Sequence, residues 1–139
     1  MLAIVLLLAL STESCGELCS ADAVEHYIRL NALASMTRYE SERAAFLIRR
    51  PDGRLTTIAW QAGDTAEASY TGRIPLRCVA VIHTHPVVAP QPSKHDIAEA
   101  QRIGLAIIVI TPQSVTVATP QGTTRQLLGI GWTRAAFSR

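Results

Sequence analysis

Three side chains near the middle of the chain could bind a metal ion together. His83 and His85 follow an apolar, β-branched run at residues 78–82, which is typical of a buried strand. Alternate residues of a strand face the same side, so the two imidazoles should lie about 6–7 Å apart at their Cβ atoms. Asp96 adds a carboxylate from the element that follows. Two imidazoles and one carboxylate are a known ligand set for catalytic Zn²⁺, which keeps a fourth position for water.

Each of these residues also has an ordinary structural explanation. A single histidine at a strand end is usually a surface or core residue that binds no metal. Ser93 and Asp96 fit a capping box, in which the serine caps a helix and the acidic residue reaches back to it. Such a cap stabilises a helix by about 1 kcal/mol. The metal site is favoured by the whole set: HxHP after a buried strand, a short loop, and then SxxD at a helix start.

The pattern H-x-H-P-x6-S-x-x-D at residues 83–96 resembles the signature of the JAMM (MPN+, JAB) metallopeptidases. The likeness is closer to the compact prokaryotic JAB domains than to the deubiquitinating members, because the chain after Asp96 has no room for their long insertions. The resemblance implies that His83, His85 and Asp96 bind zinc, and that Ser93 lies beside the metal as a hydrogen-bond donor.

The same family uses a glutamate from an earlier strand to hold the attacking water. Glu42 stands just before the apolar run 44–48 and fits that place, whereas Glu40 would share its face on an extended chain. The family's spacing puts a small residue three positions after the glutamate. Ala45 stands there, where glycine is more usual. We therefore expect Glu42 to be the catalytic base and keep Glu40 as the alternative.

The activity implied by this resemblance is hydrolysis of a peptide or isopeptide bond in a protein or peptide substrate. Glu42 would transfer protons and Ser93 would stabilise the oxyanion. The alternative is a non-catalytic MPN-like binding module with a structural zinc, and the presence of every expected ligand favours the enzyme. His95 is expected not to bind the metal, because neighbouring helix residues point about 100° apart.

Length and composition indicate one globular domain. The chain has 139 residues, of which 48% are hydrophobic and 17% charged, with a net charge of +2. No basic stripe or cluster of aromatic residues indicates nucleic-acid binding. We assign residues 21–139 to the JAB-like domain.

Residues 1–20 are expected to be a signal peptide or an N-terminal membrane anchor. The apolar run 2–10 is too short for a transmembrane helix but has the length of a secretory h-region, although no Lys or Arg precedes it. Export to the periplasm or medium is therefore expected. A cytoplasmic location would follow if the run is a buried strand or lies after a wrongly assigned start codon. Cys15 and Cys19 are close enough to pair.

The remaining pattern predicts a mixed, curved β-sheet flanked by helices. We expect a helix at 21–37, capped by Ser20, with Val24, Tyr27, Leu30 and Ala34 facing the core and His26 exposed. Hairpins are expected at 43–61 around a Pro-Asp-Gly turn and at 115–128 around Thr119–Gly122, with a polar surface segment at 63–75. A helix at 93–103 that ends at Gly104 and a buried strand at 105–111 complete the set. The resemblance adds a layout like that of the cytidine deaminases.

Overall fold

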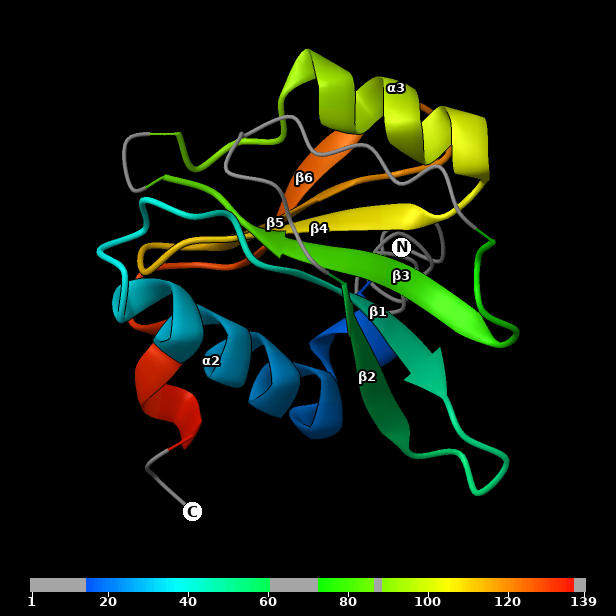
Figure 1. Ribbon diagram of the computed structural model, residues 1–139, viewed down its shortest axis with the longest axis horizontal. Coiled ribbons are helices and arrows are strands. Elements are labelled where there is room, and N and C mark those ends of the chain that lie inside the picture. The colour runs from blue at the N-terminus through cyan, green and yellow to red at the C-terminus, as the bar shows by residue number, and fades with distance from the viewer. Residues whose placement is uncertain (1–14, 61–72, 87–88, 137–139) are drawn as a thin grey trace, which may run out of the picture.

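The computed structural model describes residues 15–60, 73–86 and 89–136 (Figure 1). Residues 1–14 of the expected signal segment at 1–20, and most of the polar segment at 63–75, lie outside these residues. Two short 3-10 helices, two α-helices and six strands follow one another along the described chain: η1 Gly16–Cys19, α2 Ala21–Ser35, β1 Ala44–Arg49, β2 Leu55–Trp60, β3 Cys78–Thr84, α3 Lys94–Ile103, β4 Ala106–Ile110, β5 Val115–Ala118, β6 Thr124–Leu128 and η2 Trp132–Ala136. Within this part of the chain no helix is long and apolar enough to cross a bilayer.

The strands form one mixed sheet in the order β2-β1-β3-β4-β5-β6. Only β3 and β4 are parallel, because α3 connects them as a crossover; the other neighbours pair antiparallel. Figure 1 shows α2 against one face of the sheet and α3 against the other. The predicted mixed sheet with flanking helices is confirmed.

Each face of the sheet carries its own apolar core, because strand side chains alternate between the faces. Beneath α2 the core is large and includes Tyr27, Leu47, Ile82, Ile108 and Val117. Beneath α3 it is smaller and includes Phe46, Val81, Ala100, Ile107 and Ala118. Four consecutive residues of β4, from Ile107 to Ile110, are buried, as the unbroken apolar run predicted.

Helix α2 begins as expected and ends two residues early. The Ser20 hydroxyl accepts a hydrogen bond from the Ala23 N–H, which confirms the predicted cap. The helix ends at Ser35 because Arg38 and Tyr39 adopt positive φ, and the Tyr39 N–H returns to the Ala34 carbonyl. Ala23 is fully buried in place of the expected Val24, which packs at the margin of the core.

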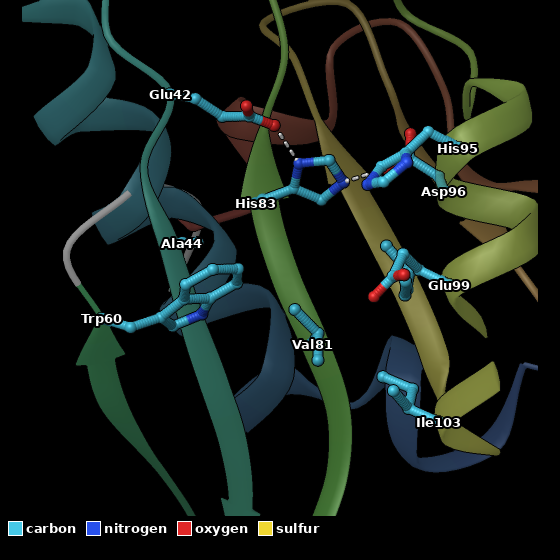
Figure 2. A pocket seen from close by; sticks show the side chains of 10 residues that line it. Glu42, Ala44, Trp60, Val81, His83, His95, Asp96, Glu99 and Ile103 are labelled. Carbon is cyan, nitrogen blue, oxygen red and sulfur yellow. Dashed lines mark hydrogen bonds and ion pairs between the residues drawn. The ribbon is translucent and has the colours of Figure 1, made fainter. Parts of the chain in front are cut away.

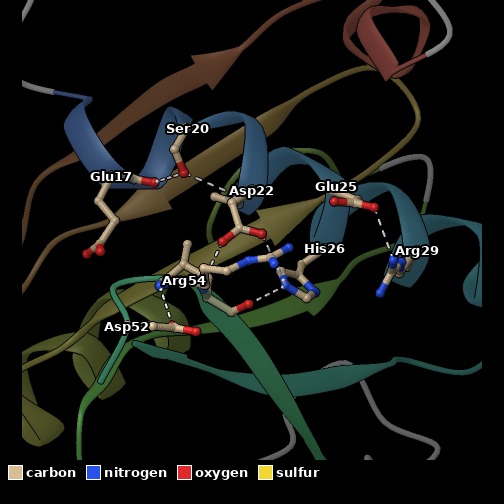
Figure 3. Close-up of polar contacts among 10 residues, drawn as sticks. Glu17, Ser20, Asp22, Glu25, His26, Arg29, Asp52 and Arg54 are labelled. Carbon is tan, nitrogen blue, oxygen red and sulfur yellow. Dashed lines mark hydrogen bonds and ion pairs between the residues drawn. The ribbon is translucent and has the colours of Figure 1, made fainter. Parts of the chain in front are cut away.

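The prediction that His26 is exposed was wrong. Its Nε2 donates to the Leu55 carbonyl at 3.0 Å, while the neighbouring Asp22 accepts from the Leu55 N–H at 2.6 Å (Figure 3). Leu55 opens β2, an edge strand whose outer backbone groups have no strand partner in the described sheet. Two polar side chains of α2 satisfy these groups, which explains why a histidine off the apolar stripe is nevertheless largely buried.

Both turn sequences form the predicted hairpins. Gly53 has φ 84° and donates to the Arg50 carbonyl at 2.9 Å, and the Asp52 carboxylate accepts from the Arg54 N–H. In the second hairpin Gly122 has φ 85° and donates to the Thr119 carbonyl. Positive φ is favourable for glycine because it has no Cβ. Cys15 and Cys19 form a disulfide at the start of the described chain.

We expect Asp22→Ala to lower the free energy of unfolding by about 1–2 kcal/mol, because the Leu55 N–H loses its acceptor. Glu25→Ala is the matched control, since Glu25 forms an exposed ion pair with Arg29 on the same helix and its loss should cost less than about 0.5 kcal/mol. Asp22→Asn keeps an acceptor and should lose less than Asp22→Ala. Urea denaturation would measure all three variants. Equal losses for Asp22→Ala and Glu25→Ala would contradict the role of Asp22 at the sheet edge.

Candidate metal centre

The two histidines lie at the end of β3 and on the α3 face of the sheet. His83 pairs with Ala44 of β1 on one side and with Val109 of β4 on the other. His85 follows the strand, and its N–H still donates to the Ile110 carbonyl at 3.1 Å. Both residues are buried, with 6% and 4% of their surfaces exposed. The ring centroids are 4.7 Å apart and the rings are nearly perpendicular, so the imidazoles converge as the alternation of strand residues predicted.

Hydrogen bonds orient both imidazoles in the same way. His83 Nδ1 bonds to Glu42 Oε1, and His85 Nδ1 bonds to the Ala89 carbonyl at 2.9 Å. A carboxylate and a carbonyl can only accept, so both Nδ1 atoms carry a proton. The Nε2 atoms are then left to bind another group. Histidines that bind metals commonly have their second nitrogen held in this way by a carboxylate or a backbone carbonyl.

Asp96 both caps α3 and faces the two histidines. Its Oδ2 accepts from the Ser93 N–H at 2.8 Å, and its N–H donates to the Ser93 hydroxyl at 3.1 Å, which completes the predicted capping box. The same carboxylate lies 3.2 Å from His83 Nε2 and 3.1 Å from His85 Nε2. The structural and the functional interpretations of SxxD are therefore compatible, because one carboxylate meets both the helix terminus and the histidine pair.

The buried atoms at this centre fit a divalent cation. Both Nε2 atoms approach Asp96 at ion-pair distance, but neither has the geometry of a hydrogen bond to it. Glu42 Oε2 also lacks a hydrogen-bond partner among the described residues. Buried polar atoms without partners are rare and destabilising. Glu42, His83 and His85 offer ligand atoms within 4.8 Å of one another. A cation at this point would satisfy the unpartnered atoms.

Glu42 reaches the centre because two hydrogen bonds with Thr84 fix the backbone of Arg43, the residue after it. Thr84, whose side chain faces away from the two histidines, accepts the Arg43 N–H at its hydroxyl at 2.9 Å and donates its own N–H to the Arg43 carbonyl at 2.8 Å. Glu42 is buried as a result, with 7% of its surface exposed, whereas Glu40 is exposed. Of the two glutamates, Glu42 is the one that lies beside the histidines.

The charges at the centre support one another. Burial alone would lower the pKa of His83, but the carboxylates of Asp96 and Glu42 outweigh it and raise this pKa to about 9. Burial likewise opposes the negative charge of Asp96, but contacts with His83 and His85 hold the pKa of Asp96 well below its usual range. The two carboxylates therefore favour positive charge at the centre, which a proton or a metal ion can provide.

A pocket opens beside the centre, between α3 and strands β1 and β2 (Figure 2). His83, Asp96 and Glu42 lie at one end of it, and His95 stands next to Asp96 on the wall formed by α3. Among the described residues, the cluster whose ligand atoms lie within 4.8 Å of one another contains Glu42, His83 and His85. It includes neither His95 nor Asp96, although the Asp96 carboxylate approaches both Nε2 atoms. No motif in the sequence marks Ala44, Trp60 or Glu99 as pocket residues. The strand register places Ala44 between His83 and Trp60 on one face of the sheet, and no local pattern in one strand specifies this register completely.

We expect the purified protein to carry about one divalent metal ion per chain, because buried nitrogen and oxygen ligands converge on one point. The double variant His83→Ala/His85→Ala should lose this metal, and elemental analysis with calorimetric titration would measure the loss. His26→Ala is the control, because it removes a largely buried imidazole far from the centre in the sequence and should keep the metal. A full metal equivalent in the double variant would contradict the site.

Comparison with known proteins agrees with this geometry. The family described as prokaryotic homologs of the JAB domain matches residues 9–126, well over half of the chain. No curated protein and no solved structure matches the chain. The family match includes both histidines, Glu42 and the capping box at the start of α3. The chain therefore belongs to the family of prokaryotic homologs of the JAB domain.

Proposed function

We propose that this protein is a zinc-dependent hydrolase that cleaves peptide or isopeptide bonds. The observation that carries the proposal is the convergence of His83 Nε2, His85 Nε2 and the Asp96 carboxylate at one buried point, with Glu42 beside them. His83, His85 and Asp96 would hold the metal. Membership of the family of prokaryotic JAB-domain homologs supports the same proposal.

Zinc is the metal that this donor set favours. Two imidazole nitrogens and one carboxylate oxygen match the three protein ligands of catalytic zinc sites, which leave a position open for water or substrate. Zinc bound there would supply Lewis-acid polarisation of the scissile carbonyl and would acidify a water molecule near neutral pH. The chain's own residues would then bind, orient and transfer protons.

Glu42 is proposed to move the proton. Its Oε1 is held by His83 Nδ1, while its buried Oε2 has no hydrogen-bond partner in the described part of the chain and can accept a proton from water. As the water oxygen bonds to the carbonyl carbon, Glu42 takes the water proton. Glu42 then gives that proton to the amine nitrogen as the C–N bond breaks. This general acid–base role typically accelerates a reaction about 10²–10⁴-fold.

Ser93 is proposed to stabilise the oxyanion of the tetrahedral intermediate. The capping box uses the oxygen of its hydroxyl as an acceptor for the Asp96 N–H. The hydroxyl proton is therefore available for donation to a developing negative charge. Ser93 is the N-cap of α3, and its hydrogen bonds with Asp96 hold it beside that residue.

We expect Glu42→Gln to reduce kcat about 10²–10⁴-fold while metal content and melting temperature stay close to those of the wild type. Glutamine can still accept the hydrogen bond from His83 Nδ1, but it cannot take a proton from water. Glu40→Gln is the matched control and should leave activity unchanged, because Glu40 is exposed. The measurement is hydrolysis of peptide and isopeptide libraries alongside zinc content.

The outcomes show whether Glu42 is a base or a metal ligand, and whether the protein is a hydrolase or a binding module. Equal activity in the wild type and Glu42→Gln would remove Glu42 as the base. Loss of metal in Glu42→Gln would make Glu42 a ligand, which its distance to the histidines permits. An absence of activity in every protein with zinc bound would support the alternative of a zinc-stabilised binding module.

We also propose that the protein is exported. The apolar run 2–10 has the length of a secretory h-region, and the disulfide between Cys15 and Cys19 suits an oxidising compartment. Mass spectrometry of the N-terminus in cell fractions should find a processed or anchored form outside the cytoplasm. An intact Met1 in a cytoplasmic fraction would contradict export.

A further inference from the structure

We propose that the pocket beside the metal centre binds a large apolar side chain of the substrate, at a residue next to the scissile bond. This proposal rests on the hydrolase function proposed above and adds the class of substrate. The pocket encloses about 430 Å³ of empty space with its open mouth included. Its metal end and its apolar end belong to one continuous hollow (Figure 2).

The hollow exists because a small residue stands between two large ones. In the register of the sheet Ala44 pairs with Trp60 of β2 on one side and with His83 of β3 on the other. Strands are spaced about 5 Å apart, so the Cα atoms of Trp60 and His83 lie about two strand spacings apart, and the residue between them carries only a methyl group. The Trp60 ring is held in place by stacking on Phe46, with centroids 5.9 Å apart.

The distance suits a residue beside the reacting bond. Consecutive Cα atoms of a peptide are 3.8 Å apart. A substrate whose carbonyl lies at the histidines therefore brings a side chain of the same or the next residue over Ala44. Beyond Ala44 the pocket is lined by Val81, Ile107 and Ile103, so the side chain that enters meets an apolar surface.

The charges of the pocket favour an uncharged side chain over a lysine. The carboxylate on its α3 wall away from the metal end belongs to Glu99, which accepts two hydrogen bonds from Arg102, at 2.9 and 2.6 Å. The Arg102 guanidinium lowers the pKa of Glu99 and offsets its charge. A cationic side chain would have to compete with Arg102, whereas an apolar side chain gains from burial against Trp60 and the isoleucines.

Two measurements on one peptide series test the proposal. The peptides are alanine-rich and fluorogenic, and each carries Phe, Leu, Lys or Ala on either side of one scissile bond. We expect the zinc-loaded protein to cleave the Phe and Leu peptides with kcat/KM at least about tenfold higher than the Ala and Lys peptides. Calorimetry with the Glu42→Gln variant should give the same order of binding, and this readout does not depend on turnover.

Variants of the pocket then link the preference to these residues. Ala44→Leu fills the hollow and should bring the preference for Phe over Ala to within about threefold, while metal content stays at one ion per chain. Trp60→Ala removes the opposite wall and should also weaken the preference. It therefore tests the same pocket if Ala44→Leu folds poorly. Ile58→Ala is the matched control, because Ile58 lies on the same strand, is 48% exposed and does not line the pocket.

The outcomes distinguish this proposal from the hydrolase function. Cleavage without preference for Phe or Leu, or with preference for Lys, would overturn the pocket and leave the hydrolase intact. If no peptide is cleaved, the binding series decides: tighter binding of the Phe peptide supports the pocket in a non-catalytic protein, and equal binding of all peptides overturns it. A preference that survives in both Ala44→Leu and Trp60→Ala would also overturn it.

Discussion

The contact between the Asp96 carboxylate and the two histidines joins the parts of this structure that matter for function. Asp96 belongs to the first turn of α3, whereas His83 lies near the end of β3 and His85 directly follows that strand. Both groups are buried, so their charges cannot be stabilised by water and must be stabilised by each other or by a cation. Burial of this contact is possible because the crossover from β3 through α3 to β4 places a helix N-terminus above the end of a strand.

The two faces of the sheet differ in the size of their apolar cores and in the sites that they carry. The face beneath α2 carries the larger apolar core, and η2 closes it with Trp132, whose indole N–H donates to the Thr111 carbonyl at 2.9 Å. The face beneath α3 has a smaller core, and its remaining area forms the metal centre and the pocket. The smaller apolar core beneath α3 leaves room on that face for buried polar atoms.

Much of this architecture was predictable from local signals. Alternation along residues 78–85 placed both histidines on one face, the turn at Pro51-Asp52-Gly53 predicted the first hairpin, and Ser93 with Gly104 marked the ends of α3. These signals depend on backbone conformations and hydrogen bonds within a few residues, so the sequence alone carries them. The HxHP and SxxD motifs also indicate the family from the sequence alone.

Other features depended on contacts between residues far apart in the chain. The burial of His26 follows from the outer edge of β2, which lies 29 residues away and has backbone groups to satisfy. The choice of Glu42 over Glu40 follows from the hydrogen bonds between Arg43 and Thr84, and the pocket follows from the register that places Ala44 between Trp60 and His83. The sequence determines which residue types the site contains, but strand register and helix packing decide the distances between those residues. Register is a property of paired strands, so no local pattern in one strand specifies it completely.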